Sequence, residues 1–114
     1  MAQILIVDDA PDIIQVLGFV LKKQGHVIAS AGNAAEALSQ AKGMQGLNIA
    51  FVDFNLPDMT GSQLAAELRK QNQGIKIIML SGQEGVDTAT LGVDAFMLKP
   101  FTSDQIKKML EGFI

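Results

Sequence analysis

The sequence of 114 residues has no cysteine, tryptophan or tyrosine, and its one histidine is His26. Without cysteine the chain cannot form disulfide bonds or bind a metal ion through thiolates. The formal net charge is −3 and no cluster of lysine and arginine stands out. Nucleic-acid binding by this domain is therefore disfavoured, because phosphate contacts require concentrated positive charge.

The sequence also lacks a long hydrophobic segment. Its apolar runs fall far short of the roughly 20 residues that a membrane-spanning helix needs, and Met1-Ala2-Gln3 lacks the basic flank of a secretory signal. Apolar residues still make up 48% of the chain, enough to fill a core, so intrinsic disorder is not expected. We expect one cytoplasmic domain, residues 1–114, that makes no membrane contact.

Short apolar runs alternate with amphipathic segments along the chain. Ile4-Leu5-Ile6-Val7 is a continuous run typical of a strand that is buried on both faces. Pro11 suits the first turn of the helix that follows, and Gly25 suits its end. The same reasoning predicts further strands at 26–30, 49–52, 75–80 and 95–98, and helices capped by Asn33 and at 60–70 and 103–112. This alternation indicates a parallel sheet with helices on both faces.

Polar residues that could bind a ligand or take part in a reaction follow the predicted strands. Asp8 and Asp9 follow the first strand, Asp53 the third, Ser81 the fourth and Lys99 the fifth. Open α/β sheets bind ligands outside the carboxyl ends of their strands. We therefore expect these five side chains to converge on one edge of the sheet.

Three carboxylates at one edge repel each other, which raises at least one pKa. A divalent cation relieves the repulsion, and a ligand set made only of oxygen selects a hard ion, Mg²⁺ or Mn²⁺. Such an ion, the Lys99 ammonium group and the Ser81 hydroxyl group could together neutralise three phosphoryl oxygens. The pattern therefore indicates phosphoryl transfer, with a carboxylate as nucleophile.

Four motifs occur in order: Ile6-Val7-Asp8-Asp9, Val52-Asp53-Phe54-Asn55-Leu56-Pro57-Asp58-Met59-Thr60-Gly61, Leu80-Ser81-Gly82 and Phe96-Met97-Leu98-Lys99-Pro100-Phe101. Each is weak alone, but together they resemble the receiver domain of two-component response regulators, the CheY-like superfamily, over essentially the whole chain. The resemblance implies a flavodoxin-like (βα)5 fold, a doubly wound five-stranded parallel sheet of strand order 2-1-3-4-5.

The resemblance implies how the acidic residues act. Asp53 would accept a phosphoryl group from a histidine kinase or a histidine phosphotransfer protein. Asp9, Asp53 and the backbone carbonyl of Asn55 would bind Mg²⁺ directly, and Asp8 would act through water. The domain would be a signalling switch, not an enzyme, although it would promote its own phosphorylation and dephosphorylation.

The resemblance also implies the switch residues. Ser81 and Lys99 would bind the phosphoryl group, and Phe96 would be the aromatic residue that turns inward with Ser81. The peptide bond between Lys99 and Pro100 would be cis. From its place on a strand alone, Phe96 is better interpreted as an aromatic residue of the core.

Residues 82–92 depart from the family pattern. The stretch from Ser81 to Lys99 is shorter than in most receivers, and its three glycines and two threonines disfavour a helix. We predict a fourth helix that is short, frayed or replaced by a loop. The family usually builds its output surface from helix four, strand five and helix five, so this departure affects the surface that passes on the signal. The sequence does not identify the partner that receives the signal, which is an unknown downstream protein or an output domain outside this chain.

Other interpretations remain for the same residues. A receiver-like module could mediate protein contacts without phosphorylation, although the intact acid cluster argues against this. A haloacid-dehalogenase-like phosphatase needs a second aspartate two residues after the nucleophile, where this chain has Asn55. A flavodoxin-like binding module needs a loop rich in serine, threonine or glycine after the first strand, where Asp8-Asp9-Ala10-Pro11 stands.

Simpler structural roles are also open. Asp8 and Asp9 could be N-capping residues of the helix that begins at Pro11. His26 is expected at the surface or at the sheet edge, away from the acidic residues. Of the six methionines, Met59 and Met97 are expected to be exposed and the others to fill gaps in the core.

Overall fold

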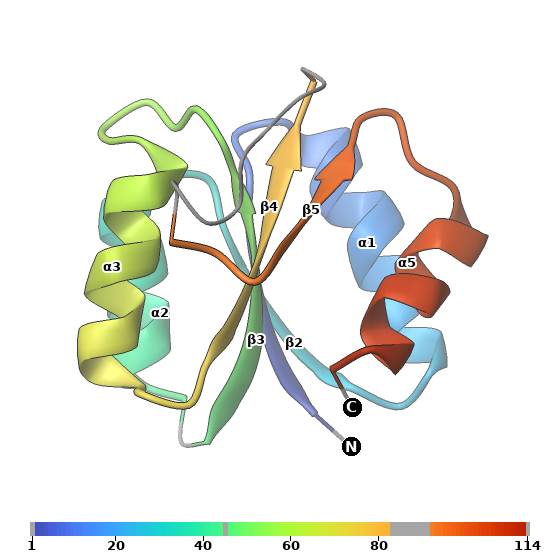
Figure 1. Ribbon diagram of the computed structural model, residues 1–114, viewed down its shortest axis with the longest axis horizontal. Coiled ribbons are helices and arrows are strands. Elements are labelled where there is room, and N and C mark those ends of the chain that lie inside the picture. Colours follow the sequence, from blue (N-terminus) through green and yellow to red (C-terminus); the bar gives the residue numbers. More distant parts are fainter. Residues whose placement is uncertain (1, 45, 83–91, 114) are drawn as a thin grey trace.

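The computed structural model describes residues 2–44, 46–82 and 92–113, which form three layers with a parallel sheet in the middle (Figure 1). The strands are β1 (Gln3–Val7), β2 (Val27–Ala31), β3 (Leu47–Asp53), β4 (Lys76–Ser81) and β5 (Ala95–Leu98). They pair in the order β2-β1-β3-β4-β5, so the predicted fold class and strand order are confirmed. The predicted fourth helix falls largely on residues 83–91, outside the described residues.

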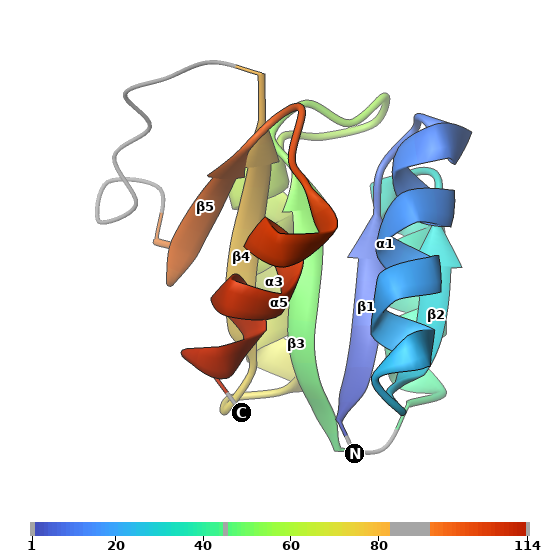
Figure 2. The same ribbon diagram turned by 90° about the vertical axis from the view of Figure 1, so that its right-hand side faces the viewer.

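Among the described residues, two helices cover each face of the sheet. Helices α1 (Pro11–Lys23) and α5 (Ser103–Glu111) lie on one face, and α2 (Ala34–Lys42) and α3 (Gly61–Gln71) lie on the other (Figures 1 and 2). Within the described part of the chain, no helix has the length and apolar character that crossing a membrane requires.

The continuous apolar run of β1 is explained by burial on both faces. Ile4 and Ile6 belong to the core under α1 and α5, whereas Leu5 and Val7 belong to the core under α2 and α3. All four side chains are fully buried. Successive strand residues point to opposite faces, so a strand with helices on both sides needs an apolar residue at every position.

The helices begin at the residues that the capping signals in the sequence predicted, but the N-cap of α1 differs from the one considered. Pro11 is the first residue of α1, and the Asn33 side chain accepts a hydrogen bond from the Glu36 N–H at 2.8 Å, which confirms the predicted cap of α2. The N-cap of α1 is Ala10, so neither Asp8 nor Asp9 is an N-cap residue.

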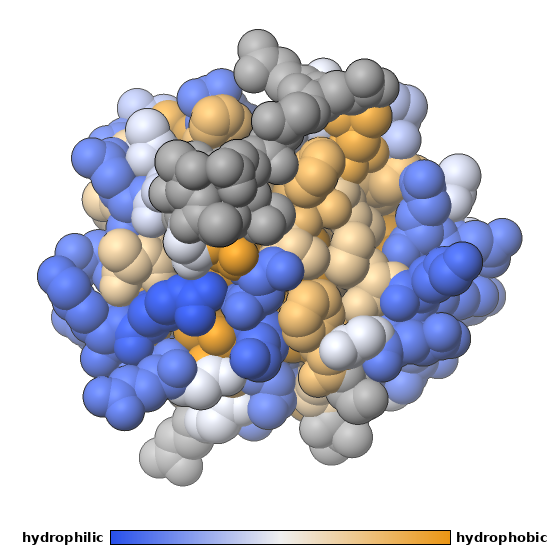
Figure 3. All heavy atoms as spheres, in the orientation of Figure 1, coloured by the Kyte–Doolittle hydropathy of each residue, from blue (hydrophilic) through white to orange (hydrophobic). Residues whose placement is uncertain are grey.

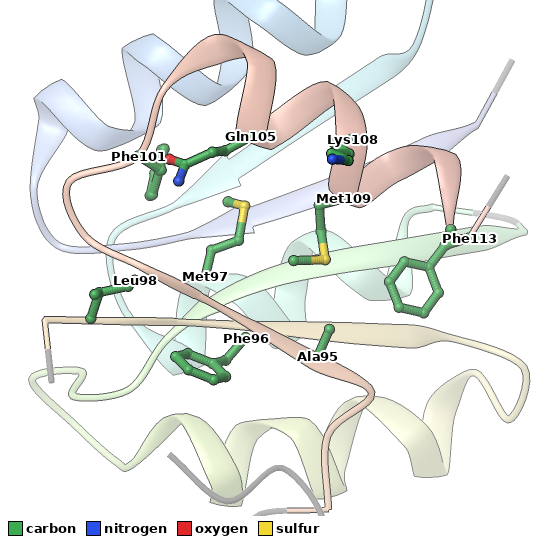
Figure 4. A pocket seen from close by; sticks show the side chains of 10 residues that line it. Ala95, Phe96, Met97, Leu98, Phe101, Gln105, Lys108, Met109 and Phe113 are labelled. Atoms are coloured by element: carbon green, nitrogen blue, oxygen red, sulfur yellow. The ribbon is translucent and has the colours of Figure 1, made fainter. Parts of the chain in front are cut away.

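The predicted position of His26 agrees with the structure, whereas that of Met97 does not. His26 lies half-buried at the amino end of β2, where its Nδ1 accepts the Ala2 N–H at 3.0 Å. Met97 is only 4% exposed, so its predicted exposure is wrong. The Met97 side chain points from β5 toward α5 and packs against the core under α1 and α5 (Figure 4).

Gly61, the first residue of α3, touches the backbone that carries Asp53. Its N–H donates to the Phe54 carbonyl at 2.9 Å. A Cβ atom here would overlap the Asp53 carbonyl oxygen and come within 2.8 Å of the Met79 sulfur. We expect Gly61→Ala to lower the free energy of unfolding by about 1–3 kcal/mol through overpacking, measured by urea denaturation.

Gly18 provides the matched control for this substitution. It lies inside α1, and a Cβ atom there would meet nothing within 4 Å. Gly18→Ala should therefore raise the free energy of unfolding by about 0.5–1 kcal/mol, the difference in helix propensity. Changes of the same sign in the two variants would contradict the steric explanation.

Candidate functional site

Three aspartates meet at the carboxyl edge of the sheet. Val7 of β1 pairs with Val52 of β3, so the residues that follow, Asp8 and Asp53, lie on neighbouring strand ends. One carboxylate oxygen from each of Asp8, Asp9 and Asp53 lies within 4.8 Å of the others. Asp8 and Asp53 are buried and Asp9 is exposed, so the acid cluster of these three residues opens to solvent on the Asp9 side.

Lys99 supplies the positive charge of the acid cluster. Its ammonium nitrogen lies 2.8 Å from Asp8 Oδ2 and 3.3 Å from Asp53 Oδ1. Its backbone N–H donates to the Ser81 carbonyl at 2.7 Å, and the Lys99–Pro100 peptide bond is cis. One ammonium group thus bridges the two buried carboxylates, those of Asp8 and Asp53.

The pKa values of the two central groups reflect this crowding. Burial raises the pKa of the Asp53 carboxyl, and the negative charge of Asp8 raises it further, against the opposing pull of Lys99. Burial alone would lower the pKa of the Lys99 ammonium, but its contacts with Asp8 and then Asp53 outweigh burial and raise it. Lys99 therefore stays charged at neutral pH, whereas the ionised form of Asp53 is less favourable in the folded domain than in the unfolded chain.

The residues of the acid cluster fit a hard divalent cation. Asp8 Oδ1 accepts the Ala10 N–H at 2.9 Å. Its Oδ2 is buried and contacts the Lys99 ammonium, but the contact is an ion pair and lacks the geometry of a hydrogen bond. A buried carboxylate oxygen beside two more carboxylates is a donor set that favours Mg²⁺ or Mn²⁺.

The remaining predicted site residues lie around the acid cluster. Ser81 is the last residue of β4 and is buried, one position beyond the Leu80 that pairs with Asp53. Asn55 lies in the exposed loop after β3, where it forms an isolated bridge with Thr60. Phe96 is not part of the acid cluster, because its half-buried ring packs on the core under α2 and α3 and points away from α5 (Figure 4).

Asp58 is a residue to which sequence reasoning assigned no role. It lies in the loop between β3 and α3, and its two carboxylate oxygens accept the N–H groups of Ala34 and Ala35, each at 2.9 Å. These hydrogen bonds lower the pKa of Asp58. Helix-capping rules consider residues next to the helix start, whereas Asp58 lies more than twenty positions away, so no local signal could have identified the contact.

A separate apolar groove of about 430 Å³ lies between β5 and α5. Figure 3 shows hydrophobic residues as a band over this part of the molecule, with hydrophilic residues on both sides. Met97 and Met109 point into the groove, and Phe101 and Phe113 lie toward its ends (Figure 4). No residue of the acid cluster lines it, so the groove is distinct from the charged site.

Comparison with known proteins agrees with this geometry. Residues 4–111 match the family model of the response regulator receiver domain. The chain is 28% identical to the probable transcriptional regulatory protein TcrX of Mycobacterium tuberculosis, covering 97% of this chain and 49% of TcrX. It is also 28% identical to the transcriptional regulatory protein GlrR of Escherichia coli, covering 96% of this chain and 26% of GlrR. The chain thus spans between about a quarter and a half of these relatives.

Solved structures show the same architecture. The chemotaxis protein CheY4 of Vibrio cholerae superimposes with a TM-score of 0.91 at 28% identity, covering 100% of this chain and 99% of that one. The response regulator protein TrrA of Thermotoga maritima, in complex with Mg²⁺ and BeF, gives 0.86 at 29% identity with both chains covered completely. Since the family match extends over most of the sequence and the strand order agrees, the chain belongs to the response regulator receiver domain family.

Proposed function

We propose that the chain is a cytoplasmic signalling switch in which Asp53 accepts a phosphoryl group from a histidine kinase or a histidine phosphotransfer protein. The observation that carries this proposal is the acid cluster, in which one carboxylate oxygen of each aspartate lies within 4.8 Å of the others while Lys99 bridges Asp8 and Asp53. Relatives in the family are signalling regulators and not metabolic enzymes.

The residues divide the chemistry among them. The Asp53 carboxylate attacks the phosphorus atom, so that a P–O bond forms while the P–N bond of the donor histidine breaks. Asp9, Asp53 and the Asn55 carbonyl would hold Mg²⁺ or Mn²⁺, with Asp8 acting through water. When bound there, the ion would neutralise charge on the phosphoryl oxygens.

Signal output follows from the new charge on Asp53. A phosphoryl group adds negative charge and acceptor oxygens. The Lys99 ammonium and the Ser81 hydroxyl would then form new contacts with these oxygens. Ser81 ends β4 and Lys99 directly follows β5, and the Lys99 backbone N–H donates to the Ser81 carbonyl. The rearrangement, with Phe96 turning in the same transition, would alter the β5–α5 face for a downstream protein or an output domain outside this chain.

Incubation with acetyl phosphate and Mg²⁺ tests the proposal directly by intact-mass spectrometry. The wild-type domain should gain the mass of one phosphoryl group, and EDTA should prevent the gain. Asp53→Asn should show no gain, because the nucleophilic carboxylate is gone, whereas Asp12→Asn, which removes an exposed acid of α1, should behave as wild type. An unmodified wild-type domain would contradict the proposal and favour a contact module without phosphorylation.

A further inference from the structure

We propose that Asp58 is a positioning residue that holds the loop after Asp53 against the start of α2, and with it the Asn55 carbonyl. The inference rests on the proposed function, because it assigns a task in binding the cation and the phosphoryl group. Asp58 itself lies outside the acid cluster and touches neither. Its effect is transmitted through the backbone of the loop.

The loop between β3 and α3 is closed on itself and fastened to α3 by backbone contacts. The Leu56 N–H donates to the Met59 carbonyl at 3.2 Å, and Asn55 and Thr60 form an antiparallel bridge across the turn. The Gly61 N–H returns to the Phe54 carbonyl at 2.9 Å. These contacts fix the shape of the loop and its junction with α3, but none of them reaches α2.

Asp58 provides the connection to α2. Both of its carboxylate oxygens are used, one by the Ala34 N–H and one by the Ala35 N–H, each at 2.9 Å. A carboxylate at a helix N-terminus is favoured by the unpaired N–H groups and by the helix dipole. The two-point contact therefore restrains the position and the rotation of the loop relative to the start of α2.

This restraint matters for the cation because Asn55 lies on the other side of the same closed turn. Asn55 follows Asp53 by two positions and precedes Asp58 by three, and its pairing with Thr60 ties the two limbs of the loop together. Mg²⁺ requires near-ideal octahedral geometry with ligands at about 2.0–2.1 Å. A loop released from α2 would hold the Asn55 carbonyl less rigidly and bind the ion more weakly.

The competing explanation is that Asp58 only stabilises α2. Asn33 distinguishes the two, because it caps the same helix through the Glu36 N–H at 2.8 Å but does not belong to the loop. Asn33→Ala removes a cap from α2 and leaves the tether intact. Asp58→Ala removes the tether, and Asp58→Asn keeps one carbonyl oxygen that can accept one of the two hydrogen bonds.

The test measures the Kd of Mg²⁺, and of beryllofluoride in saturating Mg²⁺, in the wild-type domain and the three variants. We expect about ten-fold weaker Mg²⁺ binding in Asp58→Ala, the size of effect seen for groups that support metal ligands. Asp58→Asn should be intermediate, and Asn33→Ala should bind like wild type even where its melting temperature falls. If Asp58→Ala does not fold, Asp58→Asn carries the comparison.

Two results would overturn the inference, and they are distinguishable. Wild-type affinity in the Asp58 variants, or an equal loss in Asn33→Ala, would leave the proposed function intact and reduce Asp58 to a helix cap. A wild-type domain that binds neither Mg²⁺ nor beryllofluoride would reject the proposed function, and the role of Asp58 with it.

Discussion

Asp53→Asn is expected to melt at a higher temperature than the wild-type domain in metal-free buffer at neutral pH. Burial and the neighbouring Asp8 raise the pKa of Asp53, so its ionised form is less favourable in the folded chain than in the unfolded chain. Asparagine has a similar shape and no charge, and it therefore removes this cost. Thermal unfolding followed by circular dichroism measures the difference.

Mg²⁺ should reverse the order of the melting temperatures of the wild-type domain and Asp53→Asn. At ten times its Kd, a ligand that binds only the folded state stabilises it by about 1.4 kcal/mol. The wild-type domain should gain this amount, whereas Asp53→Asn, which has lost a ligand, should gain little. A wild-type melting temperature that does not respond to Mg²⁺ would contradict the assignment of the acid cluster as a cation site.

The pH dependence follows from the same shift in pKa. A carboxyl group whose pKa is raised by folding stabilises the folded state while it is protonated, below the unfolded-state value of about 3.9. That contribution is lost as the pH rises through the folded-state pKa of Asp53. The stability difference between Asp53→Asn and wild type should therefore be largest near neutrality and shrink as the solution is acidified. A difference independent of pH would refute the electrostatic explanation.

Lys99→Met is expected to cause the largest loss of stability among these variants. It leaves the Asp8 carboxylate fully buried without its counter-ion. Removing one partner of a buried ion pair costs about 3–5 kcal/mol, and we expect about 3 kcal/mol because the Lys99 side chain is 23% exposed. Urea denaturation in metal-free buffer measures the loss, and Mg²⁺ should recover part of it by replacing the missing positive charge.

Two controls isolate the electrostatic cause. Lys70→Met breaks the exposed pair with Glu67 and should change the free energy of unfolding by less than about 1 kcal/mol. Adding Asp8→Asn to Lys99→Met removes the stranded charge and should restore part of the stability. If Lys99→Met and Lys70→Met had equal effects, or if the double variant were no better than Lys99→Met, the buried pair would not be the cause.

Local patterns accounted for the sheet and the positions of the charged residues. The run from Ile4 to Val7 predicted a doubly buried strand because alternate side chains enter two separate cores. The convergence of Asp8, Asp53 and Lys99 followed from the rule that parallel strands end at the same edge. Neither inference required knowledge of which helix packs where.

Sequence patterns did not predict the features that depend on tertiary contacts. The hydrogen bonds of Asp58 join a loop to the start of α2, a helix distant from it in the chain, and the burial of Met97 depends on its packing in the core under α1 and α5. Its place on a strand favoured a core position for Phe96, but that the ring is only half-buried against the core under α2 and α3 depends on its neighbours in the fold. Side-chain type alone does not encode these relations.

Borohydride trapping distinguishes Asp53 from its acidic neighbours as the carrier of the phosphoryl group. An acyl phosphate is reduced by borohydride to an alcohol, so the phosphorylated aspartate becomes homoserine and can be located by peptide mapping. After incubation with acetyl phosphate and Mg²⁺, we expect homoserine at position 53 and unmodified side chains at Asp8 and Asp9. Homoserine at either of those positions, or a phosphoryl mass gain without reduction at position 53, would contradict this assignment.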